Sequence, residues 1–445
     1  MTKETFLTTF FNQLNESKID YFVYGSYQSL PHDTGGSDID IVVKEADMGR
    51  LEQILKALID GNEIVLASFY SNANAKFYRI ISCSWGVQMD FFYKGLCYKG
   101  VPYYPIERLH RHLKMHNDIM RVLDQNVGFY VDYFKEAIHI GKVKDKYAQA
   151  LLDLYSSDKD LVRSDIESLY GEKALELIEA NLSLAGLKDI AKELRGILRN
   201  VILKGNTLRV FRANIINILR FFKKCPGYVI VVEGTDGSGK SFIINSITPM
   251  LNGAFHNGVV YNHLRPNVIP DIAELMGKRK KAEKDKVTVV SDPHAGKQSG
   301  FIGSFIRWSY YMIDYTFGYL KTVWPAIHTK SKVFIFDRYY YEYYFDQKRS
   351  HTSLPKWILR IGEWLLPKPD LILCLGGNPQ KIYERKPETS LEDVTRQTNV
   401  LKDFCAKRKN AVWVDTTTAP EESIRCAMNA ICDMMSHRFK NVVLR

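Results

Sequence analysis

The fold of the C-terminal half is decided by one stretch, Tyr228-Val229-Ile230-Val231-Val232-Glu233-Gly234-Thr235-Asp236-Gly237-Ser238-Gly239-Lys240-Ser241. Its five leading apolar residues predict a buried strand, and the apolar run at 242–247 predicts a helix directly after the glycines. The spacing Gly-x4-Gly-Lys-Ser lets the backbone curl so that its N–H groups face phosphate oxygens at a helix N-terminus. The stretch therefore predicts a phosphate-binding loop in an α/β domain.

The side chains of this loop indicate which phosphate compound it binds. Lys240 would place a positive charge at the terminal phosphates, and the hydroxyl of Ser241 would be a ligand of Mg²⁺. The sequence therefore predicts ATP as phosphoryl donor, Mg²⁺ as cofactor and a phosphotransferase reaction. The expected nucleotide-binding residues are Gly234, Asp236, Gly237, Ser238, Gly239, Lys240, Ser241 and Phe242.

Further strands are expected downstream of the loop, at 287–290, 333–336, 371–375 and 411–414, separated by helical patterns. Such alternation is typical of a mostly parallel sheet with helices on both faces. Ligands of these sheets collect at the carboxyl ends of strands, where Asp337-Arg338-Tyr339 follows the second of these runs. We expect Asp337 to hold Mg²⁺ directly or through water, and Arg338 to neutralise charge on the transferred phosphoryl group or the acceptor.

A later basic pair, Arg385-Lys386, suggests a helix and loop that close over the phosphates. A solvated helix face is the alternative for these residues, and the sequence leaves both readings open.

The N-terminal part has a different pattern. Residues 21–43 read as strand, Gly-Ser turn, polar loop and strand; a helix is expected at 48–59, with strands at 76–82 and 86–93. Between 106 and 222 the strand signals fade and helical spacing dominates. We therefore expect a small α/β domain at 1–105, a helical connector at 106–225 and the loop-containing domain at 226–445.

Three carboxylates of the first domain are candidates for a metal site. Asp38 and Asp40 lie on the same side of a strand because side chains alternate, and Asp90 on a neighbouring strand could join them. Carboxylate oxygens suit two Mg²⁺ ions, which would activate an attacking oxygen and stabilise a leaving pyrophosphate. Gly25 and Ser26 would hold the triphosphate of a bound nucleotide.

The segment from about Gly227 to the C-terminus resembles the thymidylate kinase family of P-loop kinases. The resemblance rests on the phosphate loop, the Asp337-Arg338-Tyr339 triplet, the strand 369–372 and Arg385-Lys386, and it covers about half of the chain. The family's Asp-Arg pair, which grips the monophosphate, is replaced here by Asp314-Tyr315. The resemblance therefore implies a related kinase whose acceptor is not thymidine monophosphate.

The same half is similar to a divergent subgroup found in bacterial gene clusters for surface polysaccharides. Its marks are Leu264-Arg265-Pro266, Asp292-Pro293-His294 and the Asp337 triplet. This resemblance implies a sugar or glycan hydroxyl as acceptor, with Glu342 as the base that accepts its proton. The acceptor-binding residues that it suggests are Arg265, Asp292, His294 and Tyr315.

The first hundred residues resemble the polymerase-β type of nucleotidyltransferase in its minimal bacterial form, on the Gly25-Ser26 and Asp38-x-Asp40 elements with Asp90. The resemblance implies a nucleotidyl transfer site with Asp38, Asp40 and Asp90 as catalytic and metal-binding residues. A retained fold without catalysis remains the alternative.

Composition limits the partners. The 445 residues carry a net charge of +11, which favours anionic partners, nucleic acid or an acidic membrane surface and also suits simple solubility. Seven scattered cysteines, the absence of a signal sequence and the absence of a long apolar run predict a cytoplasmic protein without a membrane span. The segment 357–366 would either pack in the core or lie on a membrane surface, and a dimer is also compatible.

The sequence is also compatible with two other functions. A kinase and a nucleotidyltransferase also cooperate in the repair of nucleic-acid ends, and the basic composition agrees with that role. A regulatory or defence module, in which nucleotide binding changes a conformation without rapid turnover, is the third reading.

Overall fold

The computed structural model describes residues 1–270, 272 and 299–439. Within them the chain forms two compact units. Unit 1 comprises Met1–Ile80, Val87–Lys224 and residue 439, and unit 2 comprises Ile81–Gly86 and Cys225–Arg438. Each unit has its own sheet.

Unit 2 is built on a five-stranded sheet in the order β11-β12-β10-β13-β14, with all neighbouring strands parallel. Every residue of the central strand β10 is buried, as expected for a strand covered on both faces. The strands are β10 (Tyr228–Gly234), β11 (Val259–His263), β12 (Val333–Asp337), β13 (Leu371–Gly376) and β14 (Ala411–Asp415).

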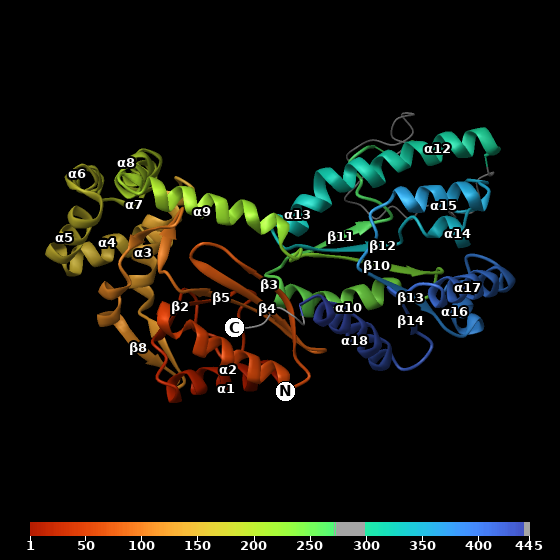
Figure 1. Cartoon of the computed structure of the whole chain (residues 1–445), viewed down its shortest axis with the longest axis horizontal. Helices are drawn as coiled ribbons and strands as arrows, with labels where there is room; N and C mark the ends of the chain where they lie inside the picture. Colours follow the sequence, from red (N-terminus) through yellow and green to blue (C-terminus); the bar gives the residue numbers. More distant parts are fainter. Residues whose placement is uncertain (271, 273–298, 440–445) are drawn as a thin grey trace. The chain divides into compact units, whose positions relative to one another are not determined.

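Helices cover both faces of this sheet (Figure 1). On one face, a core of aromatic and aliphatic residues joins β10 and β12 to α12, η6 and α15, and η6 is a π-helical stretch that continues α12. The helices are α10 (Lys240–Ala254), α12 (Phe301–Ile313), η6 (Asp314–Val323), α13 (Trp324–Thr329), α14 (Glu342–Phe345), α15 (Lys356–Leu365), α16 (Pro379–Arg385), α17 (Leu391–Ala406) and α18 (Pro420–Phe439).

Unit 1 contains a seven-stranded mixed sheet in the order β3-β4-β5-β2-β1-β9-β8. Its centre is the antiparallel pair β1 and β2, flanked by β9 and β5, each of which runs parallel to its neighbour. The strands are β1 (Tyr21–Tyr24), β2 (Ile39–Val43), β3 (Val65–Ser71), β4 (Ala75–Ile81), β5 (Gly86–Phe92), β8 (Leu113–His116) and β9 (Met120–Leu123); β6 (Leu96–Tyr98) and β7 (Val101–Tyr104) form a separate hairpin.

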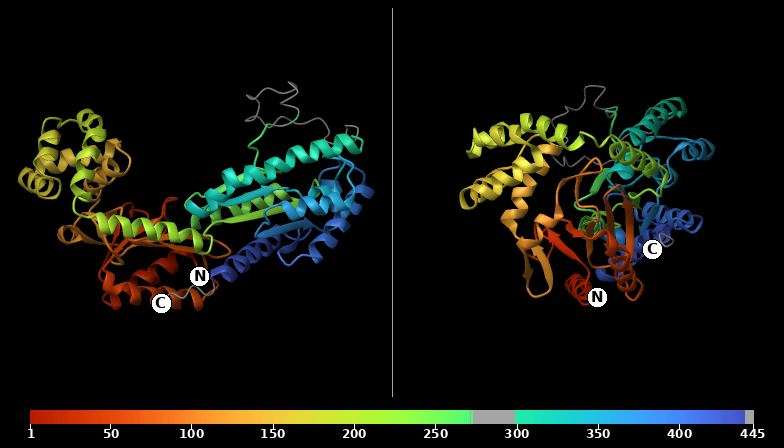
Figure 2. Two further views of the ribbon diagram at one scale, coloured as in Figure 1. Left: turned by 45° about the horizontal axis from the view of Figure 1, so that its top comes forward. Right: turned by 60° about the vertical axis from the view of Figure 1, so that its left-hand side comes forward.

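The helices of unit 1 fall into two groups. The first two precede or interrupt the sheet, and α4 to α8 gather in one cluster of short helices (Figure 2). A single core of buried side chains joins this cluster to the sheet through α3. The helices are α1 (Lys3–Glu16), α2 (Met48–Asp60), α3 (Gln125–His139), α4 (Asp145–Ser157), α5 (Lys159–Tyr170), α6 (Glu172–Glu179), α7 (Leu184–Asp189), α8 (Ala191–Leu203) and α9 (Thr207–Leu219).

The structure confirms the predicted fold class, an α/β N-terminal part, a largely helical middle and a C-terminal parallel sheet. The structure adds one detail: the mainly helical segment from 106 onward starts with two 3-10 helices, η2 (Ile106–Arg108) and η3 (His110–His112), and with the hairpin of β8 and β9, which extends the N-terminal sheet. Each strand has only four residues, and Lys114 and Arg121 interrupt the apolar ones, so the apolar pattern is too short to predict a strand. The predicted strand 287–290 lies outside the described residues.

No helix among the described residues combines the length and the apolar content that crossing a bilayer requires. The segment 357–366 mostly falls in α15, where Ile358 and Leu359 are buried while Trp357 and Trp364 are exposed.

Candidate functional site

The phosphate loop lies between β10 and α10, at the carboxyl end of the central strand. Gly237 and Gly239 have φ angles of 80° and 82°, in the left-handed region that favours glycine. A Cβ atom on Gly237 would also lie 2.5 Å from the backbone oxygen of Ile382 in α16. The loop therefore requires glycine at this position both for its backbone conformation and for its contact with α16.

Lys240 begins α10 and turns back onto the loop. Its Nζ donates to the backbone oxygens of Gly234 and Thr235, each at 2.9 Å. Burial and the neighbouring Arg338 lower the pKa of Lys240 to about 8. The loop therefore encloses the ammonium group of Lys240, which is expected to contact the ligand of the loop. Ser241 and Phe242, in the first turn of α10, are exposed.

Several polar atoms around the loop are buried and have no hydrogen-bond partner within the described structure. They are Glu233 Oε2, Thr235 Oγ1, Ser238 Oγ and Asp337 Oδ1. Buried polar atoms are nearly always paired in folded proteins, so a group of them at one sheet edge indicates a polar ligand. Hydroxyl and carboxylate oxygens are also the donors that Mg²⁺ prefers, so these residues fit a nucleotide with its metal ion.

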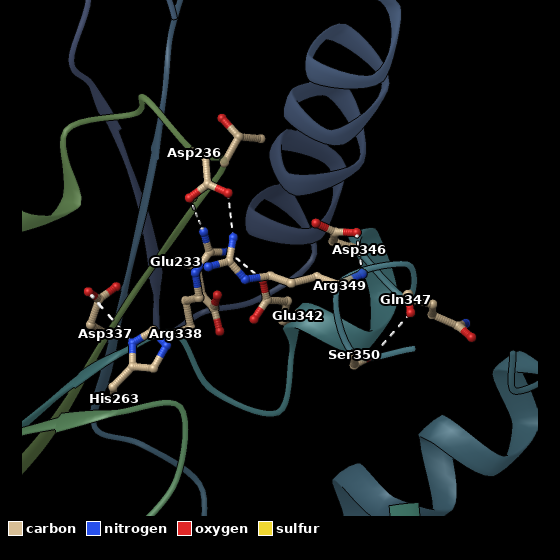
Figure 3. Close-up of polar contacts among 12 residues, drawn as sticks. Glu233, Asp236, His263, Asp337, Arg338, Glu342, Asp346, Gln347, Arg349 and Ser350 are labelled. Carbon is tan, nitrogen blue, oxygen red and sulfur yellow. Dashed lines mark hydrogen bonds and ion pairs between the residues drawn. The ribbon is translucent and has the colours of Figure 1, made fainter. Parts of the chain in front are cut away.

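Asp337 is the last residue of β12 and lies opposite Val232 of β10 in the parallel register. The hydroxyl of Tyr261 donates to its Oδ2 at 3.1 Å, and Nδ1 of His263 lies 3.9 Å from the same oxygen. Figure 3 shows His263 beside Asp337. The carboxylate is therefore oriented by the neighbouring strand β11, and its second oxygen Oδ1 is the atom left for a ligand.

Arg338 connects the strand end to the phosphate loop (Figure 3). Its guanidinium donates to Asp236 at 2.6 Å and also to Glu342. Arg349 donates to the other oxygen of Asp236, and its Nε lies 3.7 Å from Glu342. Two arginines and two carboxylates thus form one network beside the loop.

The network shifts the pKa of both carboxyl groups. Burial would raise the pKa of Asp236, but Arg338 and the other cations around it hold that pKa well below its usual range. Burial raises the pKa of Glu342, and Arg338 only partly opposes this rise. Asp236 is therefore held as an anion, whereas Glu342 takes up a proton more readily than an exposed glutamate.

Two members of this site were missed by the sequence analysis. Glu233, fully buried at the end of β10, accepts a hydrogen bond from the backbone N–H of Tyr339 at 2.8 Å, and burial raises its pKa well above normal. An acidic residue in an otherwise apolar strand was a signal that could have identified it. Arg349 lies in an irregular loop after α14, where the sequence carries no such signal.

Two of the four residues suggested for acceptor binding, Arg265 and Tyr315, form contacts within the protein itself. The buried Arg265 forms an ion pair with Asp314 at 2.7 Å, and Asp314 also accepts the backbone N–H groups of Asn267 and Val268 at 2.9 Å. Tyr315 is buried and donates its hydroxyl to the backbone oxygen of Leu264 at 3.0 Å. The structure brings these residues together around the segment after β11. Asp292 and His294 lie outside the described residues.

Arg385 ends α16, the helix whose backbone abuts Gly237. Its Nη2 donates to the backbone oxygen of Thr416 at 2.8 Å, just after β14. This bond holds Arg385 near the loop. The side of α16 that carries the buried Ile382 is packed against the protein and is not solvated.

In unit 1 the structure brings Asp38, Asp40 and Asp90 together, with one carboxylate oxygen of each within 4.8 Å of the others. Asp40 of β2 lies directly opposite Asp90 of β5 in the parallel register. Asp40 also lies opposite Tyr24, the residue before Gly25, whose φ of 90° starts the turn that carries the exposed Ser26. The Gly25-Ser26 turn therefore begins beside the carboxylates.

Two of these carboxyl groups, Asp40 and Asp90, have raised pKa values. Burial and the charge of Asp38 raise the pKa of Asp40 to about 7, and burial and Asp40 raise that of Asp90 well above normal. The side-chain amide of Gln88 donates to both oxygens of Asp90, at 3.1 and 3.2 Å. Three adjacent, partly buried carboxylates that repel one another fit a divalent cation, which would remove the repulsion.

Comparison with known proteins adds little. No protein-family model matches this sequence, and no curated protein matches it. Among solved structures, the chain is similar to a thymidylate kinase from Ehrlichia chaffeensis, with 14% sequence identity and a TM-score of 0.29 over 45% of this chain and 94% of that one. The function must therefore be argued from the residues of this chain.

Proposed function

We propose that unit 2 is a Mg²⁺-dependent phosphotransferase that moves the γ-phosphoryl group of ATP to an acceptor hydroxyl. The observation that carries this proposal is the set of unpartnered buried oxygens around the glycine loop, at the carboxyl end of a parallel sheet. A loop that served only to connect β10 and α10 would not need buried hydroxyl and carboxylate oxygens without partners.

Each residue near the loop then has a role. The backbone N–H groups of the loop bind the phosphates, and Lys240 exchanges its bonds to the loop oxygens for bonds to the terminal phosphates. Ser241 and Asp337 would hold Mg²⁺, which neutralises charge on the phosphate oxygens when bound. Arg338 and Arg385 stabilise the charge of the transferred group, since phosphoryl transfer depends on positioning and electrostatic stabilisation.

The proposed acceptor is a sugar or glycan hydroxyl and not thymidine monophosphate. At the position where a monophosphate grip would stand, the side chain of Asp314 is already paired with Arg265, and the hydroxyl of Tyr315 is bonded to the backbone. Neither side chain offers a cation to a second phosphate. Glu342 would accept the proton of the acceptor hydroxyl, because its raised pKa brings it nearer to neutral pH.

For unit 1 we propose a nucleotidyltransferase site. Its support is the cluster of Asp38, Asp40 and Asp90 beside the Gly25-Ser26 turn. The three carboxylates would bind two Mg²⁺ ions, and the turn would bind the phosphates of a nucleoside triphosphate. The two units would then form a bifunctional enzyme with two separate nucleotide sites.

One experiment tests both proposals. ATP labelled at the γ- or the α-phosphate is incubated with the full-length chain and a cell extract, and products are compared for the wild type, Lys240→Ala and Asp38→Ala. We expect Lys240→Ala to remove transfer of the γ-label and Asp38→Ala to remove transfer of the α-label, each without affecting the other. Tight ATP binding without transfer of either label would instead support a regulatory module, and label in nucleic acid would support end repair.

A further inference from the structure

Helix α9 of unit 1 exposes a continuous apolar row that extends into the following turn, η4 (Arg220–Phe222). The exposed fractions are 81% for Leu208, 60% for Phe211, 40% for Ile215, 59% for Ile218, 51% for Leu219 and 83% for Phe222. Spacings of three and four residues place these side chains on one face of the helix. A surface helix normally turns such a face toward the core of its own domain, whereas α9 turns it away from the core of unit 1.

The opposite face of α9 holds the helix on unit 1. Ala213 is the buried residue of the helix, and its Cβ would lie 2.9 Å from a Cβ added to Gly100, in the turn between β6 and β7. Val210 packs against the core of unit 1. The apolar row is therefore not needed to attach α9 to unit 1.

The charge of the same segment identifies the partner. Residues 207–224 contain five basic residues and no acidic one: Arg209, Arg212, Arg220, Lys223 and Lys224. A helix with large apolar side chains on one face and arginine and lysine beside them is typical of segments that lie in the interface of a membrane. Arg220 lies over the ring of Tyr70 in unit 1, 5.1 Å from its centroid, and the other long basic side chains can reach the headgroups while the apolar row enters the acyl region.

We propose that α9 and η4 dock on a membrane surface that contains anionic lipids. A second copy of the chain is a poorer partner, because a two-fold contact through this face would bring two sets of basic residues together without a carboxylate on either helix. Nucleic acid is a poorer partner as well, because four of the six side chains in the row are aliphatic and offer bases no ring to stack on; the exposed rings of this segment are Phe211, Phe221 and Phe222. The proposal is independent of the proposed catalytic functions.

Sedimentation with lipid vesicles tests it on the full-length chain. We expect the wild type to sediment with vesicles of phosphatidylcholine and phosphatidylglycerol, and less with phosphatidylcholine alone. The triple variant Leu208→Ser/Phe211→Ser/Phe222→Ser should lower the bound fraction about tenfold on the mixed vesicles, because the buried apolar area is lost. Arg209→Gln/Arg212→Gln/Lys223→Gln should remove the preference for the anionic lipid and its sensitivity to salt.

A matched variant controls for the loss of exposed apolar side chains in general. Met115→Ser/Ile140→Ser/Leu184→Ser replaces three exposed apolar residues of unit 1 outside α9, and it should bind vesicles like the wild type. The proposal is overturned if the wild type stays in the supernatant with the mixed vesicles, or if the α9 variants bind as well as the control. It is also overturned if sedimentation velocity gives a dimer that only the apolar variant dissociates while no form binds vesicles.

Discussion

Arg338 donates from Nη2 to Oδ1 of Asp236 across 2.6 Å and thereby joins the end of β12 to the phosphate loop. Arg338 is 2% exposed and has a φ of 69°, so the backbone turns sharply where the strand ends. Its other nitrogen donates to Glu342. The position of the loop and the position of the strand-end residues therefore depend on each other.

The first prediction concerns this ion pair. Asp236→Asn removes one of the two carboxylates that contact the buried guanidinium of Arg338. This should lower the free energy of unfolding of unit 2 by about 2 kcal/mol. The loss is smaller than for a buried charge left without any partner, because Glu342 still contacts Arg338. Denaturant titration followed by tryptophan fluorescence reports mainly on this unit, because Trp308, Trp324, Trp357, Trp364 and Trp413 belong to it and only Trp85 lies in the hairpin between β4 and β5.

Arg349→Gln is the matched control for Asp236→Asn. Arg349 contacts the same carboxylate, but its side chain is 21% exposed and water can replace the lost contact. Arg349→Gln should therefore lower the free energy of unfolding of unit 2 by less than about 1 kcal/mol. Equal losses for the two variants would show that the Arg338 contact has no special weight in the stability of the site.

The second prediction is a pH dependence of ATP binding. The pKa of Lys240 is lowered to about 8, and a bound triphosphate would favour its charged form and raise that pKa again. Binding then takes up a proton above pH 8, so affinity falls as pH rises. We expect the Kd of Mg-ATP, measured by calorimetry, to increase about tenfold between pH 7 and pH 9.

Lys240→Arg provides the comparison, because arginine keeps its charge throughout this range. We expect this variant to bind Mg-ATP more weakly than the wild type at every pH, since the guanidinium does not fit the enclosed position. Its Kd should be constant between pH 7 and pH 9. A wild-type Kd that does not change over the same range would mean that Lys240 is not the group that meets the phosphates.

Much of the fold and part of the site could be predicted from the sequence. The phosphate loop and the run before Asp337 carry strong local patterns, and both strands lie where expected. The alternation of side chains along a strand placed Asp38 and Asp40 on one side. The cluster was then complete once Asp90 was expected on the neighbouring strand. Arg349 could not be found in this way, because its contact with Asp236 spans 113 residues and depends on how an irregular loop folds back.

The third prediction concerns the carboxylates of unit 1. The pKa of Asp40 is raised to about 7 from 3.8, so in the metal-free protein its stabilising contribution is complete below about pH 4 and is lost as pH rises through 7. Asp40→Asn should therefore raise the free energy of unfolding by roughly 2–4 kcal/mol at pH 8 without metal, and by little at pH 4. Scanning calorimetry with a chelator present would measure this difference.

Adding Mg²⁺ should reverse the order of stability at pH 8, because the wild type gains a ligand that Asp40→Asn binds poorly. Asp153→Asn, a change of the same chemistry at an exposed position of α4, should have no metal-dependent effect. If Mg²⁺ or Mn²⁺ stabilises Asp40→Asn as much as the wild type, the cluster does not bind the cation.

The fourth prediction compares two glycines of the phosphate loop that have nearly the same backbone conformation, with φ of 80° at Gly237 and 82° at Gly239. Alanine at either position incurs the strain of the left-handed region, about 1 kcal/mol. The nearest atom to a Cβ at Gly239 is 3.8 Å away in Thr416, whereas at Gly237 it is the backbone oxygen of Ile382 at 2.5 Å. Gly237→Ala must therefore also displace α16 or the loop.

We accordingly expect Gly239→Ala to lower the stability of unit 2 by about 1 kcal/mol, and Gly237→Ala by at least about 2 kcal/mol with loss of Mg-ATP binding. Tryptophan-detected unfolding and calorimetric titration would measure the two effects on the same samples. Because the strain is common to both variants, their difference reports the contact between the loop and α16. Indistinguishable stabilities and affinities would mean that α16 yields freely, and Arg385 at its end would then have no fixed position relative to the phosphates.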